Sequence, residues 1–262
     1  MDLGLKGKRA LVFGAGAGLG KAAAMSLAAE GAIVVVAGRT LDKLDNTVKE
    51  IKAAGGQAHA LVWDVKNVEA ISANVDAAKK LLGGPVQILF NNGGGPPPTP
   101  AHGQSVQAWH DQFYSMVIPV IAITDAVLPD MQAAGWGRIL TNASSGVITP
   151  ISGLAMSNSL RGSLVGWSKT LAGEVAKSGI TVNMVLPGRI ATDRLKFLDE
   201  ARAKRENTTV EDVERRLKGA IPMGRYGEMR EYGDTVAFLA SERASYITGS
   251  MVRVDGGQIP SI

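Results

Sequence analysis

The sequence predicts an α/β fold in which helices cover both faces of one parallel sheet. Short β-branched runs alternate with longer segments of helical periodicity along most of the 262 residues. The short runs are almost continuously apolar, as expected for strands that are buried on both faces of a parallel sheet. Glycines follow several of these runs directly, where such folds turn tightly. The alternation implies right-handed crossovers and therefore a doubly wound sheet.

Seven strands are expected, each from one compact apolar run. They cover residues 9–14, 32–38, 58–64, 86–92, 138–144, 180–188 and 249–257. Glycines mark the ends of the first helices, and helices are expected over 18–31, 42–56, 68–84, about 105–133 and about 153–177. No internal repeat and no linker-like change of composition interrupts this order. Residues 1–262 are therefore predicted to form a single domain.

Two segments interrupt the alternation. Residues 91–104, NNGGGPPPTPAHGQ, must form a loop, because prolines lack an N–H donor and three successive glycines resist order. Residues 192–222 read as a charged helical insertion between the last two strands. This insertion is either a solvated helical pair or a lid over a substrate pocket. We favour the lid, because the segment leaves the carboxyl end of a strand, where open α/β sheets bind ligands.

Composition and charge exclude several classes of function. The absence of cysteine excludes disulfides, thiolate metal sites and a thiol nucleophile. The net charge is +4 with mixed signs along the chain, which argues against a nucleic-acid surface. The longest apolar run, residues 116–123, is too short to span a bilayer, and no signal-peptide layout begins the chain. The three histidines lack metal-ligand spacing. We expect a cytoplasmic protein that acts on a small molecule without a metal, a nucleic acid or a membrane.

The turn after the first strand has the pattern of a dinucleotide-binding loop. The spacing GxxxGxG is formed by Gly14, Gly18 and Gly20, with an additional Gly16. Glycines in this context let phosphate oxygens approach backbone N–H groups at a helix N-terminus. At the end of the second strand, where NAD-binding chains carry a carboxylate, this chain has Gly38 followed by Arg39. A guanidinium suits a 2′-phosphate and favours NADP(H), although Arg39 could also be a surface arginine.

These motifs, together with several others, occur in an order that resembles the short-chain dehydrogenase/reductases over about residues 6–257. The others are WDV at 63–65, NNGG at 91–94, GRILTNASS at 137–145, LPG with IATDRL at 186–195, and FLASERASYITGSMVRVDGG at 238–257. Within the family, the chain is similar to members that resemble 3-oxoacyl-[acyl-carrier-protein] reductase. The resemblance implies a seven-stranded Rossmann fold, oxidoreductase activity with NADP(H), and a homotetramer or dimer formed through the two long helices.

The resemblance also implies cofactor contacts at the matching positions. Leu19 belongs to the glycine turn, and Arg161 matches a residue that binds the nicotinamide ribose. The remaining expected contacts are Asp64 and Val65 at the adenine, Asn91 and Gly93 along the adenosine ribose and nicotinamide side, and Pro187, Gly188, Ile190 and Thr192 at the nicotinamide amide and nearby phosphate.

The catalytic positions of this family are largely changed. Relatives combine an asparagine, a serine, a tyrosine that protonates the carbonyl oxygen, and a lysine on the same helix face as the tyrosine. Ser144 keeps the serine position, but Ser157, Arg161 and Met116 replace the tyrosine, lysine and asparagine. A serine hydroxyl is a poor proton donor, and an arginine cannot relay a proton because it is never deprotonated. Arg161 can still bind ribose hydroxyls and stabilise developing negative charge.

Three functions are compatible with this pattern. The first is an NADP(H)-dependent oxidoreductase that reduces a carbonyl, imine or activated alkene, in which Ser144 and Ser157 orient the substrate and Arg161 stabilises charge. Its proton would come from water or from His102 or His110, each of which is more simply a surface histidine. The second is a catalytically impaired NADP(H)-binding homologue that acts as a sensor or partner subunit. The third, a purely structural subunit, leaves the glycine turn and Arg39 unexplained.

Overall fold

The structure, a computed structural model, describes residues 1–261 and confirms the predicted doubly wound sheet. The strand order is β3-β2-β1-β4-β5-β6-β7, and every neighbouring pair is parallel. The strands are β1 (Arg9–Phe13), β2 (Ile33–Gly38), β3 (Gln57–Val62), β4 (Ile88–Asn91), β5 (Gly137–Asn142), β6 (Ile180–Pro187) and β7 (Met251–Val254). The order reverses between β1 and β4, and ligands of open α/β sheets bind at such a point.

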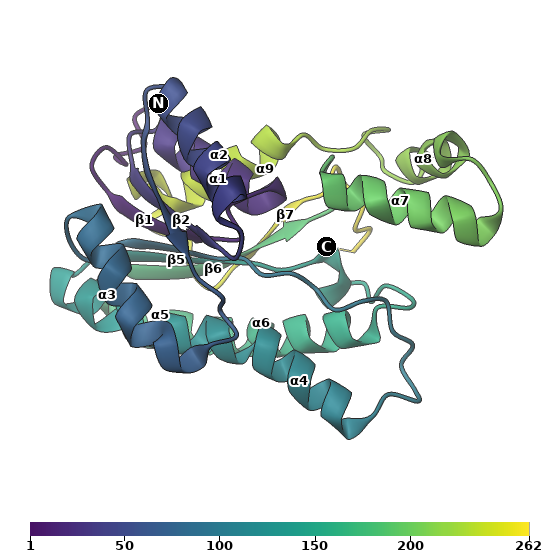
Figure 1. The fold of residues 1–262 in the computed structure, drawn as a ribbon, viewed down its shortest axis with the longest axis horizontal. Coiled ribbons are helices and arrows are strands. Elements are labelled where there is room, and N and C mark those ends of the chain that lie inside the picture. The colour runs from purple at the N-terminus through teal and green to yellow at the C-terminus, as the bar shows by residue number, and fades with distance from the viewer. Residues whose placement is uncertain (262) are drawn as a thin grey trace.

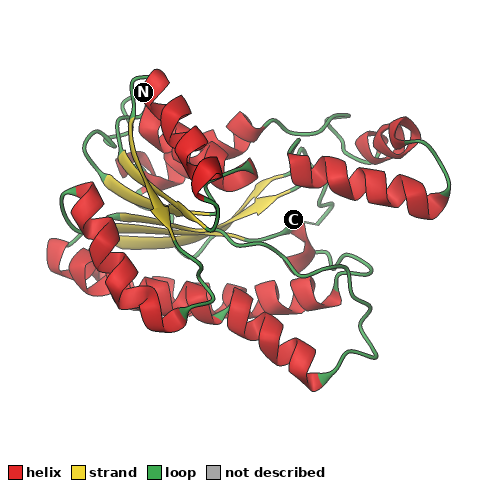
Figure 2. Cartoon of the chain, in the orientation of Figure 1, coloured by secondary structure: helices red, strands yellow, loops and turns green. Residues whose placement is uncertain are grey.

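Helices cover both faces of the sheet (Figure 1, Figure 2). One layer consists of α1 (Gly18–Ala29), α2 (Leu41–Ala53) and α9 (Met229–Ala240). The opposite layer consists of α3 (Ile71–Leu82), α4 (Val106–Met116), α5 (Ile118–Ala134) and α6 (Ala155–Val175). Two further helices, α7 (Asp193–Glu206) and α8 (Val210–Gly219), extend beyond the end of the sheet and make the predicted insertion a helical pair.

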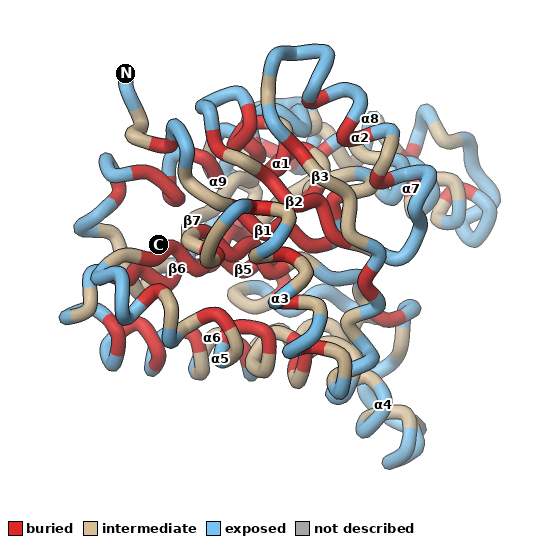
Figure 3. Tube along the Cα trace, turned by 60° about the vertical axis from the view of Figure 1, so that its left-hand side comes forward, coloured by how far each residue is buried: buried red, intermediate tan, exposed pale blue. Residues whose placement is uncertain are grey.

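The core explains why the strands read as continuous apolar runs. On β1, Ala10 and Val12 pack into the cluster beneath α1 and α9, whereas Leu11 and Phe13 pack into the cluster on the other face. Figure 3 shows the same burial along the central strands. Because both faces are covered by helices, neither set of alternating side chains meets water, and no polar alternation is needed.

The predicted long helix over residues 105–133 is wrong in one respect, since it consists of two helices that meet at Val117. Pro119 has no N–H to donate to the preceding turn, which accounts for the break. By length and composition alone, residues 106–134 are apolar enough to cross a membrane. In the folded chain they form α4 and α5, and α5 packs against α3 and β5.

Helix α9 is not predicted from the sequence, because Gly233 and polar residues obscure its periodicity. Glycine inside a helix costs about 1 kcal/mol relative to alanine. Here tertiary packing requires it, since a Cβ at Gly233 would lie 2.5 Å from the carbonyl oxygen of Ala22 in α1. The contact between α1 and α9 therefore decides the local structure, and local propensity does not.

The last strand is shorter than the predicted 249–257 and ends at Val254. Gly256 and Gly257 follow with φ values of +61° and +83°, in the left-handed region that no strand contains. The other strand boundaries differ from prediction by a few residues at their ends.

Candidate cofactor and active site

A cleft lies where β1, β2, β3 and β4 end, at the reversal of strand order. Several of the predicted cofactor residues line it together, namely Gly14, Gly16, Arg39, Asp64, Val65 and Gly93. The cleft forms because the residues that follow parallel strands meet at one edge of the sheet. The structure therefore joins the glycine turn, the end of β2 and the NNGG loop in one site.

The glycine turn is shaped by steric exclusion. Gly14 and Gly18 have φ values of +61° and +55°, which a residue with a side chain adopts only with strain. Gly20 is buried, and a Cβ there would overlap the Gly14 carbonyl oxygen. Helix α1 then begins with Ala17 at its N-cap and no side-chain cap, so its first N–H groups are free to bind an anion.

Two cations stand at the far end of this cleft. Arg39 is exposed, and among residues 1–261 it has no ion pair or side-chain hydrogen bond. Lys43 lines the same cleft, and its Cβ lies 3.0 Å from the position of a Cβ on Gly16. Asp64 also lines this cleft, and its Oδ1 accepts from the Lys66 N–H at 3.1 Å. Lys43 was not predicted, although its position four residues after Arg39, in the first turn of α2, is a usable signal.

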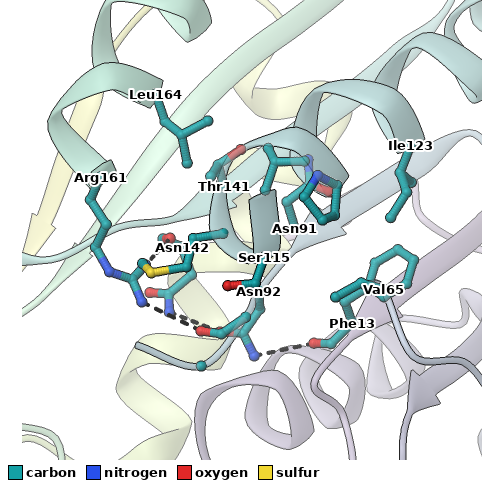
Figure 4. A pocket seen from close by; sticks show the side chains of 15 residues that line it. Phe13, Val65, Asn91, Asn92, Ser115, Ile123, Thr141, Asn142, Arg161 and Leu164 are labelled. Carbon is teal, nitrogen blue, oxygen red and sulfur yellow. Dashed lines mark hydrogen bonds between the residues drawn. The ribbon is translucent and has the colours of Figure 1, made fainter. Parts of the chain in front are cut away.

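Helix α6 presents Ser157 and Arg161 on one face, as their spacing predicts. Arg161 donates from Nη1 to the backbone oxygen of Asn142 at 3.1 Å and from Nη2 to the oxygen of Gly93 at 3.4 Å (Figure 4). Burial lowers the pKa of Arg161 from its usual value, and no carboxylate among the described residues counters this effect. The guanidinium is nevertheless charged at any workable pH.

The two serines have different surroundings. Ser157 Oγ lies 3.9 Å from the position of a Cβ on Gly95, so it borders the same loop as Arg161. Ser144 Oγ instead accepts from the Gly146 N–H at 3.1 Å and caps a short turn. Met116 lines the cavity that also contains Arg161, in the place where relatives have an amide. The structure thus gathers Ser157, Arg161 and Met116 around the loop, while Ser144 Oγ has a backbone partner.

The remaining predicted cofactor residues are divided between different surroundings. Thr192 lies against the glycine turn, with its Cγ2 3.7 Å from the position of a Cβ on Gly18, and both residues line a second cleft. Asn91 is buried and donates from Nδ2 to Thr124 Oγ1 at 3.3 Å, and it lines the small cavity beside Arg161. Leu19 packs towards the core rather than lining these clefts.

Of the predicted contacts at and after the end of β6, only Thr192 lies at the glycine turn. Pro187 and Gly188 line none of these clefts, and the Gly188 N–H donates to the Val254 oxygen at 2.9 Å. Ile190 is buried, and it points towards Gly227, where a Cβ would lie 2.6 Å from the Ile190 Cδ1. Ile190 lines a separate cleft beside β7.

A buried carboxylate ties α7 to this segment. Asp199 is 2% exposed, and it accepts from Arg189 Nη1 at 3.2 Å and from the Tyr226 hydroxyl at 2.7 Å. Burial, reinforced by the hydrogen bond to Asp199, raises the pKa of Tyr226. The sequence contains no distinguishing signal for Asp199, which is one charge among many in the insertion.

Comparison with known proteins places this site in a family. The family described as enoyl-(acyl carrier protein) reductase matches residues 14–258. The chain belongs to the short-chain dehydrogenase/reductase family. A 3-oxoacyl-[acyl-carrier-protein] reductase of Pseudomonas aeruginosa is 33% identical over 261 residues, which cover 99% of this chain and all of the relative. The resemblance inferred from the motifs is confirmed.

Solved structures agree with this assignment. L-sorbose reductase of Gluconobacter frateurii, complexed with NADPH and L-sorbose, has a TM-score of 0.93 and 29% identity, and each chain is covered completely. A variant of actinorhodin polyketide ketoreductase with NADPH has a TM-score of 0.91 and 32% identity over 97% of this chain and 98% of its own. The single-domain Rossmann fold and the family's oxidoreductase character are therefore established.

Proposed function

We propose that this chain uses NADPH to reduce a carbonyl, imine or activated alkene, with a guanidinium in place of the family's tyrosine–lysine pair. One observation carries the proposal. Arg161 reaches the carbonyls of Asn142 and Gly93, at the border of the cleft that the glycine turn and Arg39 line. A charged donor is thus held next to a dinucleotide-shaped site, which a merely structural subunit does not require.

NADP(H) is the cofactor of the chain. Arg39 and Lys43 provide two positive charges beside the end of β2, the position at which NAD-binding chains carry a carboxylate that binds the ribose. Charge-assisted hydrogen bonds to a 2′-phosphate are roughly twice as strong as those between neutral groups. The glycine turn and the start of α1 would hold the pyrophosphate, because no side chain caps the first N–H groups of this helix.

In the proposed reaction, bound NADPH supplies the hydride, and the chain orients the substrate and stabilises charge. Arg161 binds the nicotinamide ribose hydroxyls and places a fixed positive charge near the oxygen or carbon that becomes negative. Ser157 and Ser144 orient the substrate by hydrogen bonds. Water supplies the proton, because neither serine is acidic enough near neutral pH.

The missing phenol narrows the substrates that suit this site. Simple ketones need proton transfer to oxygen as hydride arrives, which a tyrosine provides in relatives. An iminium already carries its positive charge, and an activated alkene spreads the negative charge over a conjugated acceptor. Neither needs an acid at the moment of hydride transfer. The fixed charge of Arg161 would stabilise the anion formed from an activated alkene, whereas a cationic iminium gives a neutral amine and gains nothing from it, so the alkene fits this site best. The family is described as an enoyl reductase family, and a relative is a 3-oxoacyl reductase, so activated alkenes and β-ketoacyl thioesters both belong in the test.

The deciding experiment is NADPH oxidation across β-ketoacyl thioesters, simple ketones, diketones, cyclic imines and activated alkenes. We expect turnover of imines or activated alkenes above that of simple ketones. The double variant Ser157→Tyr with Arg161→Lys should lower this activity, because the phenol fills a pocket built for another substrate. A gain of ketone reduction in the double variant would instead mean that the chain is a reductase lacking only its proton donor.

The second candidate is an NADP(H)-binding homologue without catalysis. It is favoured by one observation, that Ser144 alone matches the family's four catalytic positions and its hydroxyl is engaged with Gly146. Tight NADPH binding with no turnover across the whole panel would support this candidate and reject the first.

Three further features belong to the proposal. The pair α7–α8 acts as a lid, because Thr192 at its start touches the glycine turn.

The chain works in the cytosol as a homotetramer or dimer. About 28% of the most apolar window of residues 106–134 is buried in the single chain, which leaves apolar surface for a second copy. Sedimentation equilibrium tests the assembly, and a monomer at micromolar concentration would contradict it.

A further inference from the structure

A continuous line of side-chain hydrogen bonds crosses the molecule from α9 to the end of β1. The Tyr232 hydroxyl donates to Asn142 Oδ1 at 2.8 Å, and Asn142 Nδ2 donates to Asn92 Oδ1 at 2.8 Å. Asn92 Nδ2 then donates to the backbone oxygen of Phe13 at 3.1 Å. All three bonds point in the same direction, so each group is a donor to the next.

This line touches both halves of the site. The backbone oxygen of Asn142 accepts from Arg161, and the second acceptor of Arg161 is Gly93, the neighbour of Asn92 (Figure 4). At the other end, Asn92 Nδ2 lies 2.6 Å and 2.7 Å from the positions that a Cβ on Gly14 and on Gly20 would occupy. The glycine spacing thus leaves room for the Asn92 amide as well as for a phosphate.

We propose that Tyr232 is a positioning residue for Arg161 and for the glycine turn. The inference rests on the function proposed above for Arg161. Asparagine side chains have one accepting and one donating end, and either end could point to a neighbour. The Phe13 carbonyl can only accept, so Asn92 turns its Nδ2 towards it and its Oδ1 towards Asn142, which leaves Asn142 Oδ1 facing Tyr232. The Tyr232 hydroxyl gives this last oxygen its donor and thereby holds both amides in place.

The surroundings of Tyr232 support this role. The residue is fully buried, and burial raises the pKa of its hydroxyl, so the group remains a donor at every pH at which the protein is studied. A buried network that is completely satisfied rigidifies its members, whereas a partly satisfied one is costly. The same burial prevents Tyr232 from being a displaced catalytic acid, because its proton is held by Asn142 and no substrate atom can reach it.

The test is Tyr232→Phe, which removes one oxygen and leaves Asn142 Oδ1 without its donor. We expect the dissociation constant for NADPH to rise about threefold to tenfold, the usual net value of one hydrogen bond. Ser241→Ala is the matched control, because it also removes a buried hydroxyl beside α9, one that bonds only to the backbone of Phe238 and Arg243. The control should change thermal stability without changing NADPH affinity.

A double-mutant cycle separates positioning from general destabilisation. In an Arg161→Ala background, Tyr232→Phe should have a smaller effect on NADPH affinity, because only the part transmitted through Asn92 to the glycine turn remains. Weaker binding in Arg161→Ala combined with unchanged binding in Tyr232→Phe would overturn this inference and leave the proposed function intact. Unchanged binding in Arg161→Ala would overturn the proposed role of Arg161 itself.

A second variant serves if Tyr232→Phe does not fold. Asn142→Asp keeps the acceptor for Tyr232 and removes the donor to Asn92, at nearly unchanged volume. It should weaken NADPH binding by a similar factor, and ¹⁵N spectra should show the Asn92 side-chain amide signals displaced. Wild-type NADPH affinity with unmoved Asn92 signals would contradict the proposal.

Discussion

The glycine turn and helix α6 border the same site, but they are constrained in different ways. In the turn, backbone atoms and the Asn92 amide occupy the space that side chains at Gly14 and Gly20 would need. On α6, Ser157 and Arg161 meet a loop of small residues, and Gly95 has no neighbour nearer than 3.8 Å to its would-be Cβ. The glycine turn is therefore defined by sterics, and the α6 side of the site by the chemistry of a few side chains. A family fold can keep the first while changing the second.

The largest effect on stability should come from Gly20→Ala, which overpacks the glycine turn. Its Cβ would overlap the Gly14 carbonyl oxygen and lie 2.7 Å from Asn92 Nδ2, neither of which can move freely. Overpacking a close-packed site costs about 1–3 kcal/mol and occasionally more, and we expect the upper end of this range. Denaturant unfolding with and without NADPH measures the loss.

Gly173→Ala on α6 provides the control for this substitution, because nothing lies within 4 Å of its would-be Cβ. It should stabilise the chain by up to about 1 kcal/mol through helix propensity. If Gly20→Ala and Gly173→Ala changed the free energy of unfolding equally, the distinction between the two regions would be wrong.

The next effect concerns charge at the end of the cleft. Arg39→Asp should weaken NADPH binding by about 1.5–3 kcal/mol, the value of a charge-assisted contact, and change NADH binding little. Isothermal titration with both cofactors measures the difference, and Lys43→Ala should show the same selectivity with a smaller loss. A wild-type chain that prefers NADH would contradict the assignment of Arg39.

The smallest effect concerns the lid and its buried anchor. Asp199→Asn keeps a hydrogen-bonding side chain but removes the charge that faces Arg189, and it should loosen α7 by about 1 kcal/mol of local opening. Hydrogen exchange over residues 193–219 should therefore be faster in this variant, and in the wild type it should slow when NADPH and substrate bind. The control is Glu211→Gln, an exposed charge on α8. Equal, strong protection of the wild type in both states would leave a rigid helical pair.

The same contrast explains what could be predicted from the sequence. The glycine turn, the seven strands and the Ser157–Arg161 pair are local patterns, in which a few neighbouring residues carry the whole signal. Tyr232 and Asn142 are 90 residues apart, and although Asn142 lies in the motif GRILTNASS, Tyr232 belongs to none, so only the packing of α9 on the sheet brings them together. Asp199 could not be predicted either. Only its burial distinguishes it from its charged neighbours, and burial depends on the tertiary structure.

The connection between α7 and α8 makes this helical pair sensitive to the ionic strength of the solution. The pair buries little apolar surface, with Ala203 and Val213 its buried apolar side chains. Glu206 instead joins Arg216 across the turn and Arg202 on α7 itself, and their hydrogen bonds lower the pKa of its carboxyl to about 2. This contribution is present above the unfolded pKa and fades only as the pH falls towards 2. Dissolved salt screens such exposed pairs, with a Debye length of about 8 Å at physiological ionic strength. Ionic strength, rather than mild acidity, should therefore set how stiff this helical pair is.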